Sequence, residues 1–80
     1  MPTLQAYEKL GPVAARLHQD YLEARRDWRA AVDAQWAAYD ALKSGVATEQ
    51  ELQAAIARTH EAHAAMKQAQ SRAAHAERSQ

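Results

Sequence analysis

Two long stretches of this chain, residues 13–43 and 49–78, contain neither glycine nor proline, and this feature restricts the fold more than any other. About a quarter of the 80 residues are alanine, which has the highest helix propensity of all residues. Nothing within either stretch interrupts a helix. We therefore predict an all-α chain with two long helices, each roughly 45 Å long at ~1.5 Å per residue.

Apart from Pro2, helix-breaking residues occur at two places, one before each long stretch. Gly11-Pro12 is the first, and Ser44-Gly45 is the second. Thr48, with Glu51 three residues later, matches a capping box, in which each side chain pairs with a free backbone donor at the start of a helix. We expect one helical-hairpin domain over residues 1–80, with a short N-terminal helix at 3–10, a helix at 13–43, a turn at 44–48 and a helix at 49–78. A tight turn between helices of similar length favours an antiparallel hairpin.

Both long stretches carry a heptad pattern typical of a coiled-coil seam. Small or apolar residues recur at alternating steps of three and four, which places them along one side of a helix. The first seam comprises Ala14, Leu17, Tyr21, Ala24, Trp28, Ala31, Gln35, Ala38 and Leu42. The second seam comprises Leu52, Ala55, Thr59, Ala62, Met66, Ala69, Ala73 and Ala76.

Folding the chain about Gly45 brings the two seams into register. The fold pairs Trp28 with Met66, and it pairs Gln35 with Thr59. A single polar layer of this kind can specify register in a coiled coil. We therefore expect a hydrogen bond between the Gln35 and Thr59 side chains.

A second apolar stripe flanks the seam on one side of the predicted hairpin. Val32, Tyr39, Ile56 and His63 occupy the heptad positions on this side, and Trp36 lies next to them. A two-helix hairpin cannot cover such a stripe with its own residues, and a large aromatic residue there is typical of an interface. We predict that these five residues bind a partner protein. We further expect self-association through this stripe into a homodimeric four-helix bundle.

Length and charge limit the functions that the chain supports. A domain of this size buries only a modest share of its surface alone, which favours oligomerisation. Ten basic residues balance ten acidic ones, so no net charge draws the chain to nucleic acid or to an anionic membrane. The sequence has no cysteine, no apolar segment of membrane-spanning length and no secretory signal pattern. We expect a cytoplasmic protein without membrane contact.

The histidines nearest to a known metal motif are His60 and His63, which flank Glu61. The zincin motif His-Glu-x-x-His requires one residue more between its histidines. The heptad assignment also directs His60, Glu61 and His63 to different sides of the helix. We therefore expect solvent-facing histidines, with His63 at the edge of the apolar stripe, and neither a metal site nor a cofactor.

The densest basic cluster, Arg25, Arg26 and Arg29, suggests an alternative role in nucleic-acid binding. Acidic residues surround these arginines, whereas nucleic-acid surfaces are usually basic without interruption. The sequence has no glycine-rich phosphate loop, and a two-helix hairpin offers no catalytic pocket. We therefore expect no enzymatic activity.

The sequence as a whole indicates a small protein–protein interaction module. Adaptors, inhibitors and assembly factors of this kind are common in bacteria and phages. The alternative is a small dimeric regulator that contacts nucleic acid through its arginine cluster. The sequence does not identify the partner protein.

Overall fold

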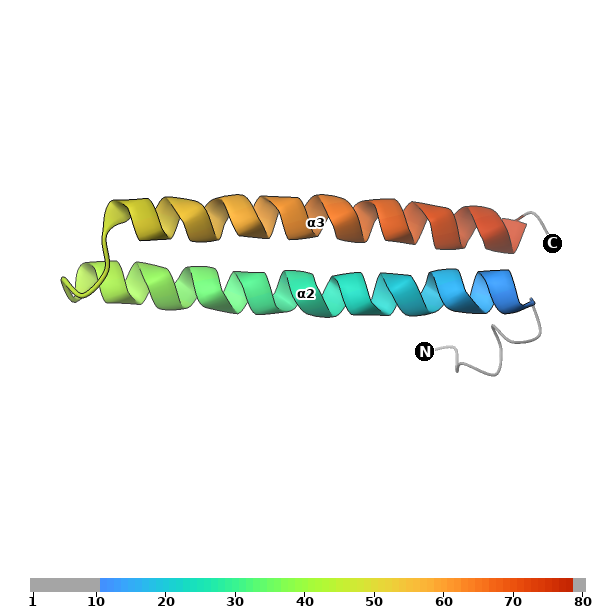
Figure 1. Cartoon of the computed structure of the whole chain (residues 1–80), viewed down its shortest axis with the longest axis horizontal. Coiled ribbons are helices and arrows are strands. Elements are labelled where there is room, and N and C mark those ends of the chain that lie inside the picture. Colours follow the sequence, from blue (N-terminus) through green and yellow to red (C-terminus); the bar gives the residue numbers. More distant parts are fainter. Residues whose placement is uncertain (1–10, 79–80) are drawn as a thin grey trace.

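The computed structural model describes residues 11–78, which form two long α-helices. Helix α2 covers Pro12–Lys43 and helix α3 covers Glu49–Arg78. The two helices lie side by side and run in opposite directions, joined by a short turn (Figure 1). The prediction of an all-α antiparallel hairpin is confirmed, and no strand occurs within residues 11–78. The helix expected at residues 3–10 lies outside the described residues.

Helix α2 begins at Pro12, one residue earlier than the sequence predicted. The preceding residue, Gly11, has φ 105° and ψ 162°, a backbone conformation that is essentially restricted to glycine. The Gly11 carbonyl accepts a hydrogen bond from the backbone N–H of Ala15 at 3.1 Å. Proline suits the first position of the helix because a backbone N–H there has no partner within the helix.

The turn between the helices depends on Gly45, whose φ of 77° lies in the left-handed region. The Val46 N–H donates to the Ala41 carbonyl at 2.9 Å, and the Gly45 N–H donates to the Leu42 carbonyl at 3.0 Å. These two bonds form a Schellman motif, which satisfies carbonyl groups at the end of α2.

Helix α3 begins after Thr48, which acts as its N-cap. The Thr48 hydroxyl accepts a hydrogen bond from the Glu51 N–H at 3.2 Å. Glu49 and Glu51 lie in the first turn, where negative charge interacts favourably with the helix dipole. The turn and both caps therefore stop one helix and start the next within a few residues.

The core between the helices consists mostly of alanine. Every buried residue within 11–78 except His18 lies on one of the two predicted seams. These seam residues are Ala14, Ala31, Ala55, Thr59, Met66, Ala69 and Ala73. Alanine extends only one carbon from the backbone, so this core is thin and no large side chain within residues 11–78 is completely buried.

The polar layer of the seam differs from the prediction. The Thr59 hydroxyl lies 3.1 Å from the carbonyl oxygen of Ala31 across the helix interface, and 3.0 Å from the carbonyl oxygen of Ala55 in its own helix. The hydroxyl thus donates to backbone carbonyls rather than to the side chain of Gln35. The small Ala31 side chain leaves the α2 backbone open to this contact.

Candidate functional site

A hollow of about 410 Å³ lies between α2 and α3 in the half of the hairpin nearest the turn. Trp36 and Tyr39 of α2 line it, together with Leu52 and Ile56 of α3 and the side chain of Gln35. The structure therefore brings Trp36, Tyr39 and Ile56 together, as the sequence predicted. We call Val32, Trp36, Tyr39, Leu52 and Ile56 the apolar face.

Two exposed aromatic side chains dominate the apolar face. The exposed fraction is 63% for Trp36 and 44% for Tyr39. Their ring centroids lie 6.2 Å apart in an edge-to-face arrangement, which is a favourable geometry for an aromatic pair. The Lys43 Nζ atom lies 5.5 Å from the centroid of the Tyr39 ring, within the range of a cation–π contact. These contacts place two aromatic rings and a cation side by side on the surface of the apolar face.

Val32 and His63 lie farther along the same side. Val32 is half-buried and lines a neighbouring hollow with Trp28, Arg29 and Asp33. His63 is exposed, and its ring centroid lies 5.5 Å from that of Trp28. His63 therefore borders the apolar face through Trp28.

The sequence pairs Trp28 with Met66 across the seam. Trp28 is half-buried, whereas Met66 is buried. The Trp28 ring also lies beside the ring of His63.

Sequence reasoning assigned Gln35, Leu52 and Trp28 to the seam alone, although each also lines a hollow on the side of the apolar face. The sequence spacing could have shown this second role, because residues four apart are neighbours on a helix surface. Gln35 lies four residues before Tyr39, Leu52 lies four before Ile56, and Trp28 lies four before Val32.

The position of His18 is a correction to the sequence prediction, because this residue is buried rather than solvent-facing. Its ring lies 6.3 Å from that of Tyr21, and both residues line a hollow of about 190 Å³ at the open end of the hairpin. The other histidines, at positions 60, 63 and 75, are exposed. Residues 11–78 contain no group of three or more histidine, aspartate or glutamate side chains placed to hold a metal ion.

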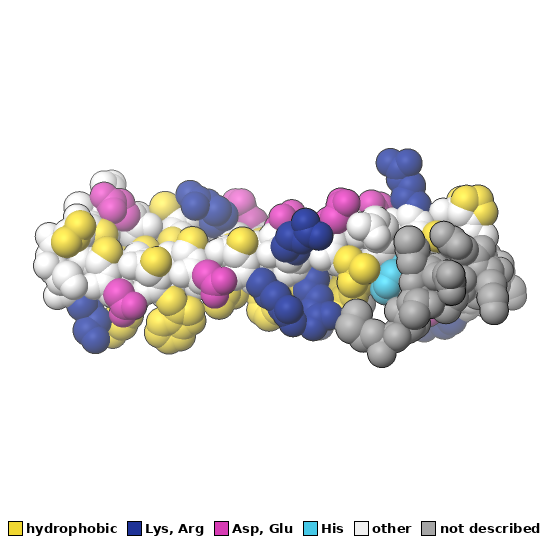
Figure 2. Space-filling view, turned by 90° about the horizontal axis from the view of Figure 1, so that it is seen from below, with side chains coloured by type: hydrophobic (Ala, Val, Ile, Leu, Met, Phe, Trp, Pro, Cys, Tyr) yellow, Lys and Arg dark blue, Asp and Glu magenta, His cyan; other side chains and the backbone are white. Residues whose placement is uncertain are grey.

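The arginines of the alternative hypothesis lie near the middle of α2. Arg25 is half-buried, while Arg26 and Arg29 are exposed. Figure 2 shows basic side chains gathered at mid-length of the hairpin with acidic side chains around them. Arg29 shares its hollow with Asp33. The surface around these arginines therefore carries mixed charge.

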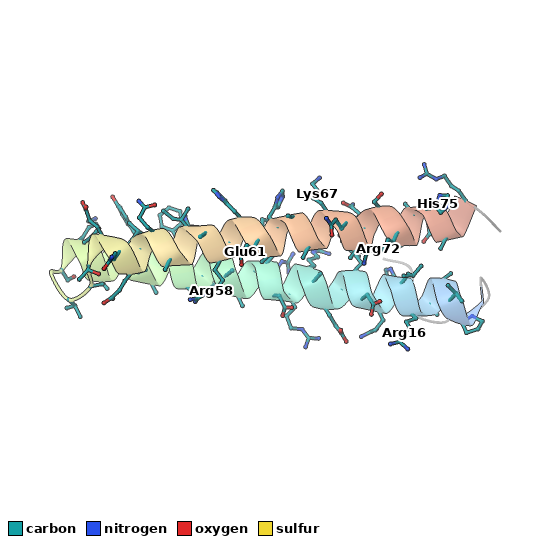
Figure 3. The ribbon with its side chains drawn as sticks, turned by 45° about the horizontal axis from the view of Figure 1, so that its top comes forward. Arg16, Arg58, Glu61, Lys67, Arg72 and His75 are labelled. Atoms are coloured by element: carbon teal, nitrogen blue, oxygen red, sulfur yellow. The ribbon has the colours of Figure 1, made fainter. Side chains whose placement is uncertain are left out.

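The charged surface of α3 has the same mixed character. Arg58, Lys67 and Arg72 lie along this helix with Glu61 among them (Figure 3). Neither α2 nor α3 contains the length of uncharged apolar sequence that crossing a bilayer requires.

Comparisons of the chain with protein-family models, curated proteins and solved structures find no match. A functional proposal therefore depends on the side chains of the hairpin itself.

Proposed function

We propose that this chain is a non-enzymatic protein–protein interaction module that binds helical partners through its apolar face, with His63 at the edge. The first partner that we propose is a second copy of the chain, which would complete a four-helix bundle. The exposure of Trp36, 63% of whose surface is accessible beside a hollow lined by apolar side chains, carries this proposal.

The total exposed area supports a partner on the hairpin. The whole chain exposes 5951 Å², whereas a compact monomer of the same mass exposes about 4800 Å². Its radius of gyration is 16.7 Å, compared with about 12 Å for a compact domain of this length. The hairpin is thus more elongated than a compact domain of its length, and its long sides offer surface that a partner would cover.

The residue types on the apolar face also support partner binding. Tryptophan and tyrosine are enriched among the residues that contribute most to protein–protein affinity. Their rings bring large contact areas with few rotatable bonds, and the rings of Trp36 and Tyr39 contact each other edge to face. Little conformational entropy would be lost when a partner covers these rings.

The test is a measurement of molar mass by light scattering over a concentration series. We expect a dimer for the wild-type chain, and we expect Trp36→Ala to raise the dimer dissociation constant by about 30-fold or more, as for a strong interface residue. Helicity by far-UV circular dichroism should remain, because Trp36 contributes little to the hairpin core.

Val13→Ala is the matched control, because Val13 is 69% exposed and lies at the open end, away from the apolar face. This variant should dimerise like the wild-type chain. A wild-type chain that stays monomeric at millimolar concentration would refute self-association. Equal weakening by both variants would show that Trp36 has no special role.

The arginine cluster provides the alternative proposal, a dimeric regulator that contacts nucleic acid through Arg25, Arg26 and Arg29. The same preparation tests it by titration with duplex DNA at low and at moderate salt. Binding that weakens steeply with salt, and that Arg29→Ala reduces, would support phosphate contacts. Binding through the apolar face would depend far less on salt.

A further inference from the structure

The hollowed side of the hairpin extends beyond the apolar face. Tyr21, Trp28 and Gln35 line three successive hollows, and they lie seven residues apart in α2. Residues spaced by seven return to the same side of a helix in a coiled-coil arrangement. One side of the hairpin is therefore hollowed from its open end to the half that contains the turn.

We infer, on the basis of the proposed function, that the second copy packs on this side with its turn at the same end as the first. A two-fold axis along the hairpin would then place α2 of each copy against α3 of the other. The two apolar faces would meet, and each copy would cover all three hollows of its partner. The result is a four-helix bundle in which neighbouring helices are antiparallel.

The position of Trp36 along α2 favours this arrangement over one with opposed turns. Trp36 lies about 10 Å from the end of α2 at Lys43 and about 36 Å from the start at Pro12, at ~1.5 Å per residue. Two copies with opposed turns and superposed apolar faces would overlap for only about 20 Å. The hollow beside Tyr21 would remain uncovered. Copies with their turns together overlap along the full helices.

The charges at the ends of the apolar face also favour the arrangement with the turns together. With the turns together, Lys43 lies close to the level of Glu49 on the second copy, because these residues end α2 and begin α3. With opposed turns and superposed faces, Lys43 instead comes level with Arg29 of the second copy, since both lie seven residues from Trp36. The same register brings Arg29 level with His63 of the second copy, and both of these side chains are exposed.

Two single-cysteine variants test the arrangement, because the natural chain contains no cysteine that would also react. Val13 and Val46 are 69% and 82% exposed and lie near opposite ends of the hairpin, so a spin label at either position should be tolerated. Each variant is prepared as the full-length dimer and labelled, and the distance between the two labels is measured by pulsed electron paramagnetic resonance. Circular dichroism and light scattering confirm the helicity and the dimer after labelling.

With the turns together, both variants should give distances below about 35 Å, which are set by the width of a four-helix bundle. With opposed turns, the two distances along the axis add up to at least about 90 Å whatever the offset, because Val13 and Val46 are separated by about 45 Å of helix. At least one variant would then exceed about 45 Å, and that result would overturn the inference. A wild-type monomer would instead refute the proposed self-association, so the two failures are distinguishable.

A charge reversal provides an independent test, because the two arrangements predict opposite changes in the affinity of the dimer. Lys43→Glu should raise the dimer dissociation constant severalfold with the turns together, because it faces Glu49 of the second copy. Adding Glu49→Lys should restore the affinity. With opposed turns, Lys43→Glu would face Arg29 and strengthen the dimer, which would contradict the inference.

Discussion

The left-handed backbone of Gly45 leads to a prediction whose magnitude follows directly from the structure. A Cβ atom at this position would meet no other heavy atom within 4 Å, so Gly45→Ala causes no steric clash with the rest of the chain. The cost comes from the φ of 77°, which is unfavourable by about 1–2 kcal/mol for a residue with a side chain. Alanine also reduces the conformational entropy of the unfolded chain, and this effect offsets about 0.4–1 kcal/mol of that cost. We therefore expect a net loss of about 1 kcal/mol per chain.

Urea denaturation followed by far-UV circular dichroism measures this loss at a single protein concentration, because association also contributes to stability. Gly45→Asn is the informative comparison, since asparagine tolerates the left-handed conformation better than other residues with side chains. It should lose less than half as much as Gly45→Ala. Val46→Ala is the control at a neighbouring exposed position and should be nearly neutral. An alanine variant as stable as the wild type would refute the left-handed turn, and equal losses for Ala and Asn would show that φ is not the cause.

Three further substitutions probe the core and the cap by the same denaturation measurement. Met66→Ala should cost about 2 kcal/mol, at the lower end for a buried large-to-small change because a thin core can partly relax; a neutral result would contradict the burial of Met66. Thr48→Ala should cost about 1 kcal/mol by removing the acceptor for the Glu51 N–H, whereas Thr48→Ser should retain it; equal stability of all three chains would argue against the cap. Thr59→Val should cost about 1 kcal/mol by removing the hydrogen bond to Ala31, and a stabilising effect would show that the bond contributes nothing.

The apolar face was predictable in part. Trp36, Tyr39 and Ile56 line one hollow, as expected from their shared side of the predicted hairpin. Heptad spacing indicates which side of a helix a residue occupies, and it therefore located these residues without any tertiary information. The spacing does not determine how far each side chain projects from the surface. Leu52 and Gln35 border the same hollow although they belong to the seam.

The sequence by itself determined the two helices, their turn and the residues of the seam. The turn at Gly45 and the cap at Thr48 form between residues that are close in the chain, so their residue types are sufficient to predict them. The seam follows from a periodicity that any pair of packed helices imposes on its residues.

Only the tertiary structure decided which side chains fit between the helices. Trp28 is half-buried with its ring beside His63, and the Thr59 hydroxyl reaches the backbone of Ala31 instead of a side chain. His18 became buried although its heptad position lies outside the seam. These outcomes depend on how closely two helix surfaces approach each other, and that distance is a property of both surfaces together, which neither helix sequence specifies alone.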